Sequence, residues 1–151
     1  MFFQKHLQIL LNDASALGGI YFSGLLLLVF LSLGNTVVAG QIFWAIALSF
    51  LAAGLIRAFY FKPRPKREEH SNWIEKLDAS SFPSVHSMRA VLLYAILAVY
   101  YRSLAISFIL AIVTLAVCAS RVLMRKHDVV DVVGGAIIGV VEALVILAIF
   151  Y

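Results

Sequence analysis

Charge is scarce in this sequence. Only 13% of its 151 residues are Asp, Glu, Lys or Arg, whereas 63% are hydrophobic, and the mean hydropathy is +0.99. This composition leaves too little polar side-chain surface to cover a water-soluble domain. From Ala14 to Ile56 the chain runs for 43 residues without a charged side chain, whereas a transmembrane helix needs only about 20 apolar residues. The sequence therefore excludes a soluble globular protein and predicts several membrane spans.

Cysteine, histidine and proline are also rare. Cys118 is the only cysteine, which excludes an intrachain disulfide and a thiolate metal cluster. The four histidines lack the paired spacing of a zinc site, so the sequence predicts no metal and no cofactor. The basic residues behind the net charge of +4 are too few, and too closely grouped beside apolar runs, for a nucleic-acid partner. A phosphate or an anionic lipid head group at the bilayer suits this charge better.

The apolar runs predict an all-α protein, a polytopic transmembrane bundle of about five spans. Residues 1–13 place apolar side chains on one helical face, which is typical of an interfacial helix at the membrane surface. The polar turn Gly34-Asn35-Thr36 divides the long apolar block. The expected spans are residues 16–34, 36–56, 85–101, 103–122 and 129–151, all within one domain, 1–151. Residues 62–83 contain all three prolines and are expected to form an active-site loop outside the membrane.

Three polar clusters mark the ends of these expected spans. Successive spans alternate in direction, so the second and fourth spans end at the membrane face where the third and fifth begin. Every basic residue except Arg102 falls at that face. The clusters are Arg57 with Arg64-Pro65, then residues 81–87 (SFPSVHS), and finally Ser120-Arg121 with His127 and Asp131. We therefore expect a single polar site at this face of the membrane.

Several of these side chains suit the binding of a phosphate. Arg57, Arg64 and Arg121 can donate forked hydrogen bonds to a tetrahedral anion. Ser84 follows Pro83 at the start of an expected helix, where its hydroxyl and the nearby backbone N–H groups can bind an anion. Taken alone, Ser84 is better explained as a helix N-cap.

The histidines offer a nucleophile and an acid. His127 and Asp131 are four residues apart, so on one helix face the carboxylate can hold one imidazole nitrogen and leave the other to attack phosphorus. The same pair could instead cap a helix end. His86 belongs to a different expected helix and is the candidate general acid.

The order and spacing of the clusters resemble those of the type 2 phosphatidic acid phosphatase family. The pattern of that family is K-x6-RP, then PSGH, then SR-x5-H-x3-D, and the match extends over residues 57–131. Two positions depart from it. Arg57 replaces the usual Lys and keeps the charge in a planar fork. Val85 replaces the usual Gly, which keeps the backbone N–H but loses the conformational freedom of glycine.

The resemblance implies a metal-independent lipid phosphatase. In the mechanism of this family, His127 would attack to form a phosphohistidine, Asp131 would orient His127, and His86 would protonate the departing lipid oxygen. The phosphate ligands that the resemblance implies are Arg57, Arg64, Ser84, Val85 and Arg121. Water would then hydrolyse the intermediate.

The expected substrate is a membrane lipid that carries a phosphate monoester or a diphosphate. The candidates are a polyprenyl diphosphate, lipid A 1-phosphate, phosphatidylglycerol phosphate and phosphatidic acid. A lipid phosphotransferase with the same site and a small non-enzymatic membrane transporter are the alternatives. Polar groups confined to one face argue against the conduction path of a transporter. The sequence leaves the physiological lipid and the oligomeric state open.

The orientation in the membrane is open to two arguments. An excess of basic residues at one face normally places that face in the cytoplasm. However, Arg57, Arg64 and Arg121 are needed by the expected chemistry and are poor topology signals. The resemblance implies a prokaryotic inner-membrane protein whose active site faces the periplasm or the exterior, and this is the orientation we expect.

A few residues have no place in the expected mechanism. Glu142 lies near the middle of the last span, where a charge is costly, and we expect it to be protonated and packed. Arg89 lies one turn beyond His86 in the third expected span, where it could line the lipid entry or bind phosphate, and its role is open. Gly135, Gly139 and Ala143 recur at four-residue spacing and predict close packing against another helix.

Overall fold

The computed structural model describes residues 2–66, 72, 75, 77 and 79–150. Within these residues the protein consists of helices joined by turns, and an isolated antiparallel bridge pairs Pro63 with Ser80. The helices are α1 (Phe2–Ala16), α2 (Ile20–Ser32), α3 (Thr36–Phe59), α5 (Val85–Tyr101), α6 (Leu104–Leu123) and α7 (Val129–Phe150). The predicted all-α class is therefore confirmed. Much of the predicted active-site loop lies outside the described residues.

The first part of the chain differs from the expected interfacial helix and full span. Helix α1 continues to Ala16, and α2 has only 13 residues, about 20 Å of helix against a hydrocarbon layer of about 30 Å. The two helices meet at a 47° bend. Gly18 lies at this bend, and a Cβ there would be 2.8 Å from the carbonyl oxygen of His86. The bend thus brings the backbone against α5 at a position that only glycine fits.

The remaining helices follow the expected spans closely. Of the described helices, α3, α6 and α7 are each long and apolar enough to cross a membrane, α1 and α2 reach that length only as a bent pair, and α5 is a shorter apolar helix. The turn before α3 lies where it was predicted. Gly34 adopts a positive φ of 74°, and the Asn35 side chain accepts a hydrogen bond of 3.1 Å from the backbone N–H of Val38.

Helices α3, α5 and α7 share a buried core. Its fully buried members include Ile42 on α3, Leu92 on α5 and Ile146 on α7. The predicted close packing of the small residues on α7 is confirmed. A Cβ at Gly135 would lie 2.5 Å from the carbonyl oxygen of Ser84, and a Cβ at Gly139 would lie 2.7 Å from that of Met88. These contacts hold the first turns of α5 and α7 tightly together.

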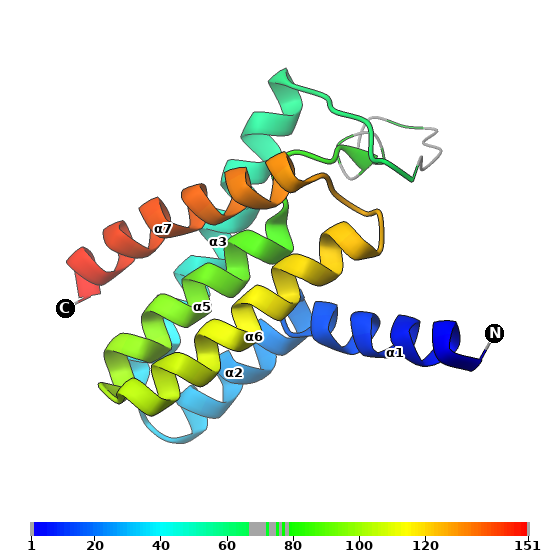
Figure 1. The fold of residues 1–151 in the computed structure, drawn as a ribbon. Coiled ribbons are helices and arrows are strands. Elements are labelled where there is room, and N and C mark those ends of the chain that lie inside the picture. The colour runs from blue at the N-terminus through cyan, green and yellow to red at the C-terminus, as the bar shows by residue number, and fades with distance from the viewer. Residues whose placement is uncertain (1, 67–71, 73–74, 76, 78, 151) are drawn as a thin grey trace.

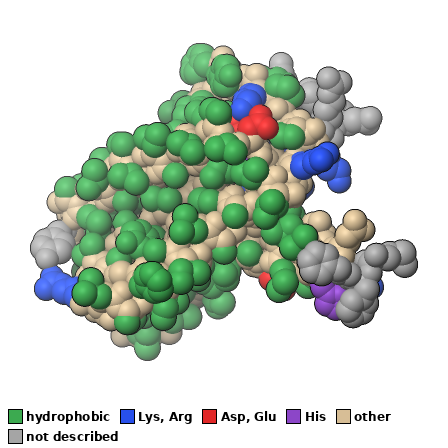
Figure 2. All heavy atoms as spheres, viewed as in Figure 1, with side chains coloured by type: hydrophobic (Ala, Val, Ile, Leu, Met, Phe, Trp, Pro, Cys, Tyr) green, Lys and Arg blue, Asp and Glu red, His purple; other side chains and the backbone are tan. Residues whose placement is uncertain are grey.

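The arrangement of the helices gives the molecule two unlike ends. Figure 1 shows α1 and the segment between α3 and α5 at the end of the bundle where α6 finishes and α7 begins. The turn between α2 and α3 and the C-terminus lie away from that end. Figure 2 shows a flank covered largely by apolar side chains, with basic and acidic groups near the ends. Long apolar helices and this apolar exterior identify a membrane protein.

Candidate active site

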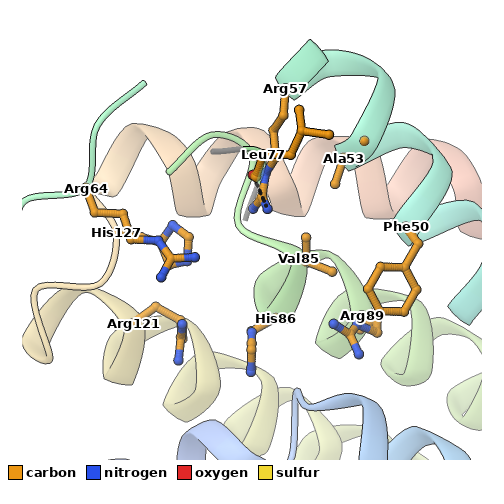
Figure 3. A pocket seen from close by; sticks show the side chains of 11 residues that line it. Phe50, Ala53, Arg57, Arg64, Leu77, Val85, His86, Arg89, Arg121 and His127 are labelled. Atoms are coloured by element: carbon orange, nitrogen blue, oxygen red, sulfur yellow. Dashed lines mark hydrogen bonds between the residues drawn. The ribbon is translucent and has the colours of Figure 1, made fainter. Parts of the chain in front are cut away.

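A cavity of about 280 Å³ opens at the end of the bundle where α3 and α6 finish and α5 and α7 begin. The side chains in Figure 3 come from α3, α5 and α6, from the segment between α3 and α5, and from the segment between α6 and α7. The residues that line the cavity are Phe50, Ala53, Gly54, Arg57, Arg64, Leu77, Val85, His86, Arg89, Arg121 and His127. The structure thus places all the predicted site residues in the lining of this cavity except Ser84 and Asp131, which are buried behind the cavity wall.

Arg57 projects from the last turn of α3 and holds the chain that precedes α5. Its Nη1 donates a 3.3 Å hydrogen bond to the carbonyl oxygen of Leu77, and its Nη2 donates a 3.0 Å hydrogen bond to that of Pro83. The planar fork of an arginine can reach both carbonyl groups at once, whereas a lysine presents a single ammonium group. Because Arg57 replaces the usual Lys, this side chain can both line the cavity and hold the backbone that precedes α5.

Ser84 is fully buried and joins two helices. Its backbone N–H donates a 3.0 Å hydrogen bond to the carbonyl oxygen of Asp131 in α7. Its hydroxyl oxygen accepts a hydrogen bond of 2.9 Å from the hydroxyl of Ser87 and one of 3.5 Å from the backbone N–H of the same residue. These bonds make Ser84 the N-cap of α5. Its phosphate-binding role stays a prediction.

Val85 begins α5 and lines the cavity. Among the described non-glycine residues only Arg102 and Arg125 have a positive φ, so Val85 adopts a backbone conformation open to any residue. The second departure from the family pattern therefore adds no backbone strain at the start of this helix.

His127 lies in the short segment between α6 and α7, and only 3% of its surface is exposed. Its Nδ1 lies 2.7 Å from the carbonyl oxygen of Ser81. A carbonyl oxygen can only accept, so Nδ1 carries the proton and Nε2 keeps its lone pair. Burial, followed by the positive charges of Arg121 and Arg64, lowers the pKa of His127 to about 4. The imidazole is consequently neutral at physiological pH.

Asp131 does not orient His127 through the direct hydrogen bond that the sequence suggested. The Oδ2 atom of Asp131 lies 3.9 Å from Nδ1 of His127. The physical reason is that α7 begins at Val129, after His127, so the four-residue spacing does not fall on a helix face. The carboxylate instead accepts hydrogen bonds from the hydroxyl of Ser81 and, at 2.8 Å, from the backbone N–H of Asp128. Ser81 thus lies between the two residues, with its hydroxyl at Asp131 and its carbonyl oxygen at Nδ1 of His127.

Lys62 is a contributor that the sequence pattern did not single out. Its Nζ lies 2.7 Å from Oδ1 of the fully buried Asp131 and 3.2 Å from Oδ2 of the half-exposed Asp128. Partial burial lowers the pKa of Lys62, but its hydrogen bonds and charge attraction to the two carboxylates outweigh that effect and raise the pKa overall. The sequence indicates this role only indirectly: a buried carboxylate such as Asp131 needs a cationic partner, but the sequence does not say which basic residue provides it.

Arg121, on the last turn of α6, ties the bent N-terminal helix to the site. Its Nη1 donates a 2.6 Å hydrogen bond to the hydroxyl of Ser15 on α1, and both side chains are buried. The sequence did not point to Ser15 either, since a serine in an apolar helix carries no signal of a distant partner. This contact sets the position of α1 beside the cavity.

The two charged residues without an assigned role lie in different places. Arg89 lines the cavity, is 4% exposed, and places its guanidinium carbon 5.0 Å from the ring centroid of Phe50. Glu142 is buried on α7 and is not part of the cavity lining. Among the described residues, no group of three or more His, Cys, Asp or Glu side chains could hold a metal ion.

Comparison with known proteins places this site in a family. The family model of the PAP2 superfamily matches residues 38–151, which is most of the chain and includes every predicted site residue. The crystal structure of Aquifex aeolicus LpxE has the same fold, with a TM-score of 0.77 and 24% sequence identity over 94% of this chain and 86% of that one. No curated protein matches the sequence. The motifs, the fold and the family match agree: the chain belongs to the PAP2 superfamily, and this membership supports the predicted lipid phosphatase.

Proposed function

We propose that this protein removes a phosphate from a phosphate monoester or a diphosphate on a membrane lipid, through a phosphohistidine intermediate and without a metal ion. The observation that carries the proposal is the pairing of a neutral, buried His127 with three arginines around one cavity. Arg57, Arg64 and Arg121 can supply the positive charge that a metal ion would otherwise provide. All 151 residues would then serve one membrane-embedded catalytic domain.

The first step transfers the phosphoryl group to His127. The lone pair of Nε2 attacks phosphorus, a P–N bond forms, and the bond between phosphorus and the lipid oxygen breaks. The departing oxygen takes the electron pair together with a proton from His86. Ser81 holds the Nδ1 proton of His127 throughout, with Asp131 behind it.

The second step returns the enzyme to its starting state. A water molecule attacks the phosphorus of the phosphohistidine, the P–N bond breaks, and inorganic phosphate leaves. His86, which has given up its proton, can accept one from this water. The arginines bind the equatorial oxygens of phosphorus in both transition states, where the negative charge develops.

The test is phosphate release from four lipids by the purified protein in detergent: a polyprenyl diphosphate, lipid A 1-phosphate, phosphatidylglycerol phosphate and phosphatidic acid. We expect release from at least one of them, unaffected by EDTA and inhibited by vanadate, which mimics the five-coordinate phosphorus of the transition state. A matched His6→Ala variant, changed at the exposed face of α1, should keep the activity. Loss of activity in EDTA and its recovery with magnesium would contradict the metal-independent route.

We propose further that the site faces the outside of a prokaryotic inner membrane. Arg57, Arg64 and Arg121 line the cavity and Lys62 pairs with Asp131, so these four basic residues are required by the site and carry little topological information. The C-terminus lies at the other end of α7 and would be cytoplasmic. A reporter fused after Tyr151 tests this orientation: fluorescent protein should be bright there and alkaline phosphatase silent, and the reverse pattern would overturn it.

A further inference from the structure

Arg89 is a buried cation outside the family motif. It lies on the second turn of α5, and 4% of its surface is exposed. Its Nε and Nη1 atoms are buried and have no hydrogen-bond partner among the described residues. A buried guanidinium with unpaired donors is costly unless an anion completes it. The ring of Phe50 offers a favourable face but no hydrogen-bond acceptor.

The position of Arg89 is between a polar cavity and an apolar one. Together with His86 it lines the phosphate cavity, and the same two side chains line a second cavity of about 420 Å³. The rest of that second lining comes from Ala16, Leu17 and residues 19–22, at the bend between α1 and α2. Leu17 and Phe22 extend the apolar path into a third cavity of about 350 Å³ between α2, α5 and α6. An alkyl chain leaving the site in this direction passes His86 and Arg89.

We propose that Arg89 binds a second phosphate, the one that stays on the lipid, and that the preferred substrate of this protein is a lipid diphosphate. The inference rests on the proposed function and adds to it the class of substrate. His86 and Arg89 are three residues apart on one helix face, about 4.5 Å along the axis, so neighbouring groups of one substrate can meet both. The terminal phosphate occupies the cavity of Arg57, Arg64 and Arg121, and the inner phosphate lies at Arg89.

The chemistry of a diphosphate suits this arrangement. His127 attacks the terminal phosphorus, the P–N bond forms, and the bond to the bridging oxygen breaks. The electron pair stays on that oxygen, which now belongs to a lipid monophosphate. Arg89 stabilises the charge that this leaving group gains, by donating hydrogen bonds to the inner phosphate. The leaving group therefore depends less on a proton from His86 than a lipid alcohol does.

The experiment compares farnesyl diphosphate with farnesyl monophosphate as substrates of the purified protein. Arg89→Gln should lower kcat/KM for the diphosphate by about 10–100-fold, the range expected for losing charge-assisted hydrogen bonds. The loss for the monophosphate should be about threefold or less. Arg89→Lys keeps the charge but not the planar fork, so its kcat/KM for the diphosphate should lie between those of the wild type and Arg89→Gln. The Lys variant also tests the inference if the Gln variant does not fold. Methylenediphosphonate should inhibit the wild type better than methylphosphonate, and Arg89→Gln should remove that difference.

Arg102→Gln is the matched control, because it removes an exposed arginine at the far end of α5 and should leave both activities unchanged. Equal losses for the two substrates in Arg89→Gln would mean that Arg89 supports the helices and would overturn the inference, as would no loss at all. A loss confined to phosphatidylglycerol phosphate, whose two phosphates are separated by glycerol, would also overturn it. If the wild type releases phosphate from no lipid, the proposed function itself fails, which is a different result.

Discussion

The ion pair of Lys62 with Asp131 gives the sharpest test of how the site is held together. Lys62→Met removes the ammonium group 2.7 Å from a carboxylate whose side chain is fully buried. Removing one partner of a buried pair typically costs about 3–5 kcal/mol. Lys62 itself is 23% exposed, and Asp131 keeps its hydrogen bonds from Ser81 and Asp128. We therefore expect a smaller loss, about 2 kcal/mol in the free energy of unfolding.

The kinetic consequence should appear in kcat rather than in KM. Lys62 does not line the cavity, so phosphate binding should change little. Without its cation, the Asp131 carboxylate keeps its hydrogen bond from Ser81 but is held less rigidly, and so is the Ser81 carbonyl oxygen that holds the Nδ1 proton of His127. A misplaced nucleophile slows the chemical step, and we expect kcat to fall by about 10–100-fold.

The assay combines thermal inactivation in detergent with steady-state phosphate release. Asp128→Asn is the control. The Oδ2 atom of Asp128 lies 3.2 Å from Nζ of Lys62 and the side chain is half-exposed, so this ion pair should contribute less than about 1 kcal/mol to the free energy of unfolding. The raised pKa of Lys62 means that its stabilisation is complete below its ordinary value of 10.5 and is lost only as the pH rises through the higher folded value. A Lys62→Met protein with wild-type stability and wild-type kcat would refute this account of the site.

Four further predictions concern the histidines and the helix contact. His127→Ala should abolish turnover, whereas His86→Ala should slow a monoester more than a diphosphate; equal losses in His86→Ala would count against His86 as the acid. Because the pKa of His127 is lowered to about 4, kcat/KM should rise with pH through about 4, and an acid limb near 6.5 would show an ordinary imidazole. Gly135→Ala should destabilise the protein by about 1–3 kcal/mol, because the added Cβ would meet the backbone of Ser84. Gly24→Ala is the control, since the space around Gly24 is open and this variant should keep the wild-type stability. Equal melting temperatures of the two variants would contradict the contact.

The helices could be predicted because the bilayer imposes a simple rule on the sequence. Long apolar runs must be helical, and charged or turn-forming residues must lie near their ends. Asn35 and Arg57 therefore mark the limits of α3 through their polarity alone. The grouping of the arginines and histidines at one end follows from the alternating direction of the spans.

The bend between α1 and α2 could not be predicted by the same rule. Hydropathy does not show where an apolar block is interrupted by a bend. Gly18 also lacks the positive φ angle that a glycine in a tight turn often adopts. Its role depends on the approach of α5 and α6, since a Cβ there would also lie 2.7 Å from Cγ1 of Val117. A tertiary contact of this kind is invisible in the local sequence.

The residues of the three sequence motifs and the residues that line the cavity are not the same set. Ser84 and Asp131 belong to the motif, yet they lie behind the cavity, where the Ser84 N–H binds the Asp131 carbonyl and joins α5 to α7. Arg89 lies outside the motif, yet its side chain lines the cavity. The motif residues suit the phosphate group that all the candidate substrates share, whereas Arg89 lies where the proposed path of the rest of the lipid begins. Substrate preference in this protein should therefore depend on Arg89 and on the bend beside it rather than on the three motifs.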